Sequence, residues 1–243
     1  MKAVETILGD CLEVLADIPD NSVDAVLTDP PYGCQDKNQV QAHGVNEGTG
    51  TVEAFKIEWN FDLPLDYLDE CARVLKPGGS LVTFTDNKKV ETVWNYVEST
   101  GLRPLQTFYW LKTNPPPQPR KNFQSAVETA VFARKPGKIL HWGGGGASKN
   151  YIETAIAMGK DRTAHPTQKH VMVFQYLIRA LCPKGGIVLD PFGGSGTTGV
   201  AALLEGRRAL LIEKSPEYFQ IMNERLEQWQ QSDQVRQLQL FGG

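Results

Sequence analysis

Two short segments of this 243-residue chain combine residue types that could do chemistry. The first is Asp29-Pro30-Pro31-Tyr32, which directly follows the apolar run 23–28. Because prolines fix φ and lack an N–H donor, the Pro30 carbonyl and the Asp29 carboxylate can form two rigidly placed acceptors. Two acceptors suit an exocyclic NH₂ group, and Tyr32 offers a ring on which a base can stack. The segment predicts a pocket for a base flipped out of a duplex; an Asp-capped Pro-Pro turn is the structural alternative.

The second segment is a glycine-rich turn that begins where an expected strand, 186–190, ends. The three glycines in 191–196 permit backbone conformations and close approaches that a side chain would block. Glu213 ends the next expected strand and can accept hydrogen bonds from both hydroxyls of a ribose. A nicotinamide enzyme or a tight structural turn would also fit this pattern. No phosphate-binding lysine follows the turn, which disfavours nucleoside triphosphates.

Apolar periodicity predicts strands that alternate with helices along the chain. Strands are expected at 5–9, 23–28, 80–84, 107–111, 128–133, 186–190 and 208–213. Helices are expected at 10–18, 64–76, 87–100, 167–182, 197–205 and 216–230, and Lys76-Pro-Gly-Gly is expected to end the second of them. This order predicts an α/β fold with a doubly wound, mostly parallel, Rossmann-like sheet, whose ligands bind at the carboxyl ends of the strands.

Together the two segments resemble the motifs of the DNA amino-methyltransferases, in the permuted β arrangement where the catalytic motif precedes the cofactor motif. Gly9-Asp10, Arg73-Val-Leu-Lys-Pro-Gly-Gly, Trp110-Leu-Lys-Thr-Asn and His165-Pro-Thr-Gln-Lys resemble further motifs of that family. The resemblance implies one methyltransferase domain over 1–243, a seven-stranded sheet in which the strands bearing Asp29 and Asp190 are neighbours, and S-adenosylmethionine as cofactor. It assigns the cofactor to Asp10, Cys11, Asp29, His165, Thr167, Lys169, Asp190, Pro191, Phe192, Gly193, Gly194, Ser195, Gly196, Thr197 and Glu213.

The residue at position 29 favours adenine N6 as the target, because N4-cytosine members of the family usually carry serine there. N4 of cytosine stays open as an alternative, as does a DNA-binding regulator without catalysis. Methylation at C5 is disfavoured because that route needs a nucleophilic thiolate, and the chain has no Pro-Cys pair.

Basic residues gather in one stretch of a chain whose net charge is −3. Residues 103–170 hold eleven Lys and Arg and three acids, which predicts one face for double-stranded DNA. A solvated basic loop is the alternative. The residues expected to contact DNA are Lys112, Arg120, Lys121, Arg134, Lys135, Lys138, Lys149 and Arg162.

Three further segments carry expectations. Residues 33–58 form a long polar loop expected to close over the base, and 136–164 form a small irregular insert for target recognition. Because this insert is short for the family, a homodimer stays open. The tail 231–243 includes Gln237–Phe241, which resembles the peptide that binds the bacterial sliding clamp; packing on the chain's own sheet is the alternative.

Four scattered cysteines favour a cytoplasmic protein with reduced thiols, no metal site is expected, and no apolar run is long enough to span a membrane.

Overall fold

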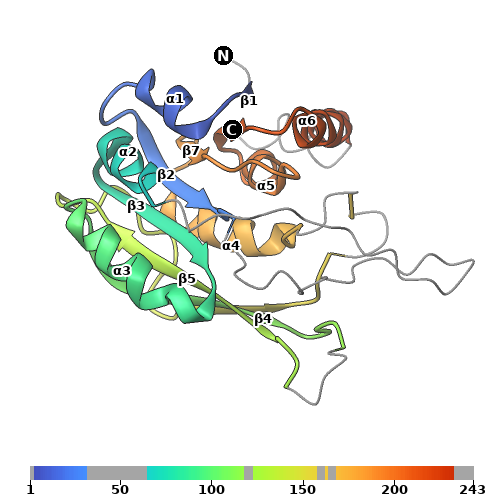
Figure 1. The fold of residues 1–243 in the computed structure, drawn as a ribbon, viewed down its shortest axis with the longest axis horizontal. Helices are drawn as coiled ribbons and strands as arrows, with labels where there is room; N and C mark the ends of the chain where they lie inside the picture. Colours follow the sequence, from blue (N-terminus) through green and yellow to red (C-terminus); the bar gives the residue numbers. More distant parts are fainter. Residues whose placement is uncertain (1–2, 32–64, 118–122, 158–161, 164–167, 233–243) are drawn as a thin grey trace, which may run out of the picture. The chain divides into compact units, whose positions relative to one another are not determined.

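The computed structural model describes residues 3–31, 65–117, 123–157, 162–163 and 168–232 (Figure 1). Contacts divide the chain into two units, residues 1–30 with 65–243, and residues 31–64. The described helices and strands all belong to the first unit. The loop expected at 33–58 and the peptide Gln237–Phe241 lie outside the described residues.

The first unit contains an eight-stranded sheet, in which strands β1, β8, β7, β2, β3, β5, β4 and β6 follow one another across the sheet. Among these strands only β5 runs antiparallel to its neighbours, which confirms the expected mostly parallel, doubly wound sheet. The bounds are β1 (Val4–Leu8), β2 (Val23–Thr28), β3 (Leu75–Thr85), β4 (Arg103–Lys112), β5 (Val127–Arg134), β6 (Tyr151–Thr154), β7 (Ile187–Asp190) and β8 (Arg208–Glu213).

The strand count corrects the expectation of seven. The eighth strand, β6, lies inside the segment expected to be irregular, and it pairs in parallel with β4 at the edge of the sheet. Only four residues long, β6 lacks the extended alternation that predicts a strand from sequence. Its backbone pairing with β4 and the hydrogen bond from Trp110 Nε1 to Thr154 Oγ1, 2.7 Å long, hold it in place.

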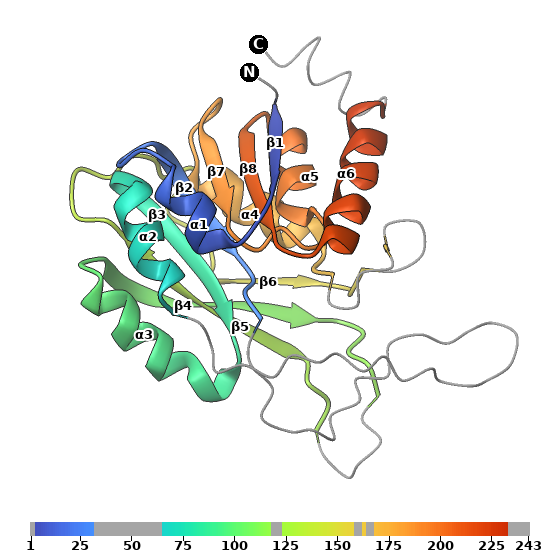
Figure 2. The same ribbon diagram turned by 45° about the horizontal axis from the view of Figure 1, so that its top comes forward.

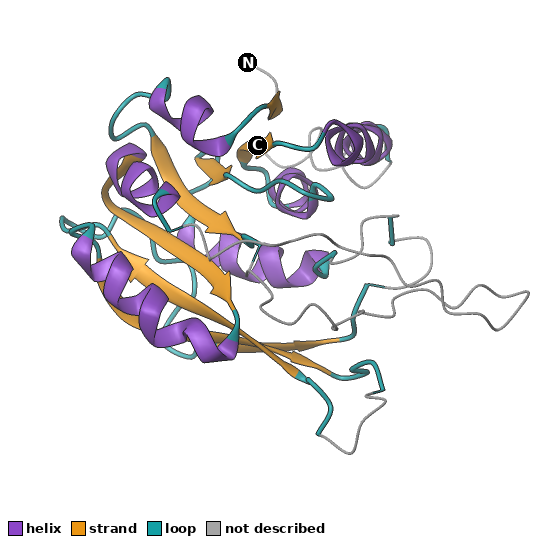
Figure 3. Ribbon diagram, in the orientation of Figure 1, coloured by secondary structure: helices purple, strands orange, loops and turns teal. Residues whose placement is uncertain are grey.

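Helices cover both faces of the sheet, as Figure 3 shows by the purple helices on either side of the orange strands. The helices form two groups of three, and within each group every helix contacts the next one along the chain. Figure 2 shows α5 and α6 beside β8 and β1. The first group is α1 (Cys11–Ala16), α2 (Tyr67–Val74), the 3₁₀ turn η1 (Asn87–Lys89) and α3 (Val90–Ser99); the second is α4 (Val171–Leu181), α5 (Thr197–Leu204) and α6 (Pro216–Gln230).

The central strand β2 explains why the fold can fix a site at its end. All six of its residues are buried, because β7 and β3 flank it on both sides and helices cover both faces. α5, which follows the glycine-rich turn, is likewise buried at all eight positions. The segments that follow β2 and β7 are therefore anchored to the most thoroughly packed part of the sheet.

The segment Lys76-Pro-Gly-Gly differs from its expected role as a helix end. α2 ends at Val74, and the segment forms the first part of β3. The chain passing at 135–140 accounts for this, since Gly78 N–H donates to the Lys135 carbonyl and the Gly78 carbonyl accepts from Leu140 N–H. Gly78 has φ +77°, and a Cβ there would lie 1.8 Å from the Lys138 carbonyl oxygen.

Gly78→Ala should therefore destabilise the fold far more than Gly101→Ala. Both glycines have positive φ, +77° at Gly78 and +85° at Gly101. Both substitutions therefore incur a left-handed backbone cost of about 1–2 kcal/mol. Only Gly78→Ala adds a collision with backbone, worth about 1–3 kcal/mol more. A Cβ at Gly101 meets no described atom within 4 Å. Urea unfolding of both variants measures the difference, and equal losses would contradict this packing.

Candidate active site

Asp29 follows β2, and Asp190 ends the neighbouring strand β7, so the two predicted motifs meet at one edge of the sheet. The Thr28 hydroxyl donates to Asp190 Oδ1 at 2.8 Å and links the two strand ends directly. Pro30 is buried and Asp29 is half-buried. Tyr32 lies outside the described residues. The adjacency of the Asp29 and Asp190 strands, expected from the family resemblance, is confirmed.

Asp190 is a buried anchor of the glycine-rich turn. Its carboxylate accepts from the hydroxyls of Thr28 and Thr198 and from Phe192 N–H. Burial raises the pKa of Asp190 to about 7, although the hydroxyls of Thr198 and Thr28 oppose that rise. Pro191 beside it is buried as well. These contacts fix the direction in which the chain enters the turn.

The turn itself has the left-handed backbone that its glycines were expected to allow. Gly194 has φ +50° and Gly196 has φ +74°, the latter at the N-cap of α5. Gly193 N–H donates to the Ile212 carbonyl, so the turn is tied to β8. The Phe192 ring packs edge-on against Tyr67, with centroids 4.9 Å apart.

Ser195 and Thr197 are buried beneath the turn and are hydrogen-bonded within the protein. Arg225 of α6, also buried, donates to the Ser195 carbonyl at 2.9 Å and to Thr197 Oγ1 at 3.1 Å. Arg225 was missed by the sequence analysis, although its place three residues after Met222 and four before Trp229 puts it on the apolar face of α6. These hydrogen bonds join the turn to α6.

Acidic side chains line the ends of the adjacent strands β8 and β1. Glu213 is half-buried, and its carboxylate accepts from Gly194 N–H and Ser215 N–H, each at 2.8 Å. Asp10 caps α1 through Leu12 N–H and pairs with Lys214 at 2.8 Å. This cap and pairing place the Asp10 carboxylate on the same edge of the sheet as Glu213.

Cys11 begins α1 directly after Asp10 and is half-buried. Burial raises the pKa of its thiol to about 11, so the thiol stays protonated at neutral pH. Cys11, Cys71 and Cys182 are all free cysteines. Position 11 therefore presents a small, uncharged side chain beside Asp10.

Lys169 joins the Asp29 carboxylate to an acid that the sequence analysis missed. Its Nζ lies 2.5 Å from Asp29 Oδ2 and 2.8 Å from Glu128 Oε2, and Glu128 Oε1 lies 2.7 Å from Lys112 Nζ. Burial alone would lower the pKa of Lys169, but the carboxylates of Asp29 and Glu128 raise it instead. Burial alone would raise the pKa of Glu128, but the two lysines outweigh it and lower that pKa. The signal for Glu128 was its place as one of only three acids in the basic stretch 103–170.

The residues expected to form one basic face do not come together. β5 runs antiparallel to β3, so Arg134 and Lys135 lie toward the amino ends of the parallel strands, opposite Asp29. Lys138 lies at that same edge, beside Gly78. Lys112 is in the ion pair with Glu128. Of the expected DNA contacts that the structure describes, Lys149 and Arg162 are exposed and lie away from the amino ends of the strands. Arg120 and Lys121 lie outside the described residues.

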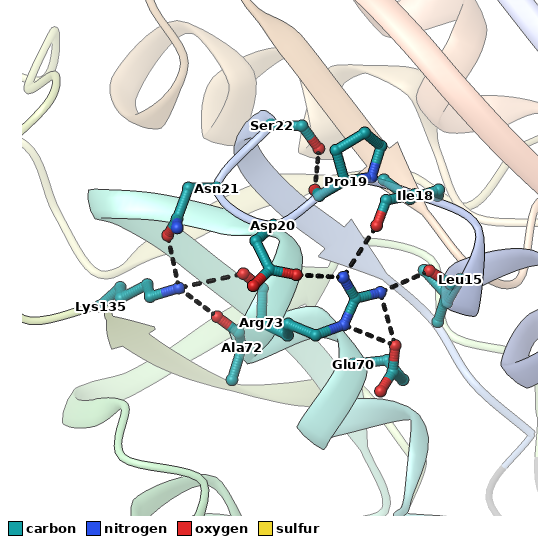
Figure 4. A network of polar contacts seen from close by, with 10 residues as sticks. All are labelled: Leu15, Ile18, Pro19, Asp20, Asn21, Ser22, Glu70, Ala72, Arg73 and Lys135. Carbon is teal, nitrogen blue, oxygen red and sulfur yellow. Dashed lines mark hydrogen bonds and ion pairs between the residues drawn. The ribbon is translucent and has the colours of Figure 1, made fainter.

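Lys135 has a structural role, drawn in Figure 4. Its ammonium donates to the carbonyls of Ala72 and Arg73, at the carboxyl end of α2, and to Asn21 Oδ1. Arg73 adds bonds to the Leu15 and Ile18 carbonyls (Figure 4). These bonds tie α2 to the connection before β2, which corrects the expectation that Lys135 is a free DNA contact.

Part of the expected recognition insert also packs on the protein itself. Gly143 N–H donates to the Ala180 carbonyl at 2.9 Å, and His141 lies 3.2 Å from the Arg179 carbonyl, so this stretch covers the carboxyl end of α4. The chain then enters β6 and returns to the edge that carries Asp29. Of the insert, the residues from β6 onward are therefore those placed near the site. His165 and Thr167 lie outside the described residues.

Metal binding and membrane insertion find no support in the described ranges. Within them, no group of three or more His, Cys, Asp or Glu side chains could hold a metal ion. Over those same residues, each helix is too short or too polar to cross a membrane.

Known proteins resemble the chain over most of its length. A family of N6/N4 methyltransferases described as DNA methylases matches residues 23–224. The Type II methyltransferase M2.MboI of Moraxella bovis is 28% identical over 89% of this chain and 85% of its own, and M.HinfI of Haemophilus influenzae is 29% identical over 92% and 68%. The solved structure of an M1.HpyAVI–SAM complex superposes with a TM-score of 0.71 at 26% identity, covering 92% of this chain and 98% of the other. The chain therefore belongs to the N6/N4 DNA methylase family and is a DNA amino-methyltransferase.

Proposed function

We propose that this chain transfers a methyl group from S-adenosylmethionine to N6 of an adenine flipped out of double-stranded DNA. The observation that carries the proposal is the position of Asp29 and Pro30 directly after β2, one strand from the glycine-rich turn that follows β7. Two acceptors and a nucleoside-binding turn at one sheet edge suit a base and a cofactor that must meet.

The residues around the turn fit S-adenosylmethionine. The left-handed Gly194 and Gly196 keep Cβ atoms away from a close ligand, and Glu213 stands at the strand end where ribose hydroxyls are bound in related folds. Asp10 and Cys11 would lie against the adenine ring of the cofactor. When bound, the cofactor supplies an electrophilic methyl group on a sulfonium sulfur.

Asp29 and Pro30 would prepare the target nitrogen. An exocyclic amino group is a poor nucleophile because its lone pair is delocalised into the ring. Hydrogen bonds from its two hydrogens to the Asp29 carboxylate and the Pro30 carbonyl favour a tetrahedral nitrogen with a localised lone pair. The same acceptors stabilise the positive charge that develops on nitrogen, so their effect is greater in the transition state than in the ground state.

The test is the identity of the methylated nucleoside. Purified protein is incubated with labelled S-adenosylmethionine and DNA, and the DNA is hydrolysed to nucleosides. Label in N6-methyl-2′-deoxyadenosine is the expected result, and label in N4-methyl-2′-deoxycytidine would establish the cytosine alternative instead. Cofactor binding without any label in DNA would favour a regulator that has lost catalysis.

DNA binding is proposed for Lys149 and Arg162, the members of the basic set that are exposed and lie away from the edge that carries Arg134 and Lys135. Phosphate contacts release counterions, so affinity should fall steeply between about 50 and 200 mM salt. Lys149→Ala and Arg162→Ala should each lower the salt slope by about 1. Lys138→Ala, a charge-matched control at the opposite edge, should leave the slope unchanged. Equal effects of all three substitutions would count against this placement of DNA.

Two partner expectations stay predictions. Binding of a bacterial sliding clamp through Gln237–Phe241 falls outside the described residues. A homodimer would extend the small surface left for reading bases, since His141 and Gly143 of the insert pack on α4.

A further inference from the structure

Four side chains of alternating charge form a continuous row that ends at Asp29. Lys112 at the end of β4 pairs with Glu128 of β5, Glu128 pairs with Lys169, and Lys169 pairs with Asp29. The three distances are 2.7, 2.8 and 2.5 Å. Glu128, at the centre of the row, belongs to none of the sequence motifs that predict the reaction.

The row is largely shielded from water. Lys169 is 8% exposed, Lys112 12%, Asp29 18% and Glu128 21%. Charges with so little access to water are costly unless each has a partner of opposite sign. Glu128 contacts both lysines. Its carboxylate therefore gives Lys169 a second negatively charged partner besides Asp29.

The position of Lys169 matters for the proposed reaction. Positive charge develops on the target nitrogen as the methyl group arrives, and the carboxylate expected to stabilise it, Asp29, is also the partner of a lysine 2.5 Å away. Two positive charges close to one carboxylate repel each other, and the repulsion is strong where the effective dielectric constant is low. A second carboxylate beside the lysine reduces that repulsion.

We propose that Glu128 is a positioning residue that holds Lys169 beside Asp29 and keeps the ion row electrically neutral while positive charge forms on the substrate nitrogen. The inference rests on the proposed function of Asp29. The two lysines and two carboxylates of the row sum to zero. Glu128→Gln leaves the row with one excess positive charge, and adding Lys112→Gln returns it to zero while Lys169 keeps Asp29 as its partner.

The test is a charge-rescue cycle in the full chain. The turnover number kcat, the KM for DNA and the Kd for S-adenosylmethionine are measured for the wild type, Glu128→Gln, Lys112→Gln and the double variant. We expect Glu128→Gln to lower kcat by about 10- to 100-fold, in the range of coupling energies between contacting charges. The Kd should change by less than about threefold, because neither of the substituted residues, Glu128 and Lys112, is among those assigned to the cofactor. The double variant should regain at least about tenfold in kcat over Glu128→Gln.

Structural damage predicts a different result. If Glu128 only supports folding, the losses of the two single variants multiply in the double variant, and that outcome would overturn the inference. Should Glu128→Gln fail to fold, the neutral double variant decides: a folded double variant within about tenfold of wild-type kcat supports the inference, and a larger loss overturns it.

The two proposals fail in distinguishable ways. An active wild type whose kcat is unaltered by Glu128→Gln overturns this inference alone. A wild type that binds cofactor but transfers no methyl group overturns the proposed function, and this inference with it.

Discussion

Asp29→Ala is expected to lower the rate of methyl transfer by about a thousandfold or more. Removing one preorganised group that stabilises transition-state charge typically costs about 10²–10³ in kcat. This substitution also leaves Lys169 as a positive charge without the Asp29 carboxylate beside the substrate. Cofactor affinity should stay within a few-fold, because the groups proposed to hold the cofactor, Glu213 and the glycine-rich turn, follow other strands. Single-turnover transfer and calorimetric titration with S-adenosylmethionine measure the two quantities separately.

The matched control is Asp29→Asn. The amide keeps one oxygen acceptor of the same size but carries no negative charge, so its rate should fall between those of the wild type and Asp29→Ala. A parallel loss of cofactor affinity in both variants would show that Asp29 holds the cofactor, and would contradict the separation of roles between β2 and β7.

Glu213→Ala is expected to produce the converse result, a loss of cofactor affinity by about a hundredfold or more. Two hydrogen bonds to a charged acceptor are worth about 1.5–3 kcal/mol each, and ribose hydroxyls would lose both. At saturating cofactor, methyl transfer should remain within about tenfold of the wild type, because the groups proposed to contact the target base are intact.

Glu217→Ala is the control for this change, because Glu217 is an exposed acid at the start of α6. Glu213 also accepts from Gly194 and Ser215 N–H, so thermal unfolding must show that each variant folds. Unchanged affinity in folded Glu213→Ala would place the ribose elsewhere.

The features that the sequence predicted are those encoded locally. The mostly apolar run of β2 predicts a buried strand, and the glycines after β7 predict where β7 ends in a turn. Because β2 and β7 are parallel neighbours, Asp29 and Asp190 then lie at the same edge of the sheet. The adjacency of the strands that bear Asp29 and Asp190 followed from the resemblance and is confirmed, and β6 adds an eighth strand to the seven expected. Glycine at 194 and 196 was expected to allow left-handed backbone, and it does so.

The features that it did not predict depend on partners distant in sequence. Lys76–Gly79 joins a strand because the chain at 135–140, beyond two further strands, pairs with it. The sequence predicted Lys135 as a DNA contact because its hydrogen-bond acceptors, at the carboxyl end of α2, are more than sixty residues away in the chain. Glu128 and Lys169 are far apart in the sequence, and their pairing follows from the packing of β5 against the segment before α4. Charge composition gives the number of such groups but not their partners.

Sequencing the DNA of cells that express the chain, with methylation detection, shows whether Asp29 directs a methyl group to adenine. We expect N6-methyladenine at one short recurring sequence in cells that express the wild type, and none at that sequence in cells that express Asp29→Ala at equal abundance. Modified adenine at the same sites with both proteins, or with neither, would contradict it.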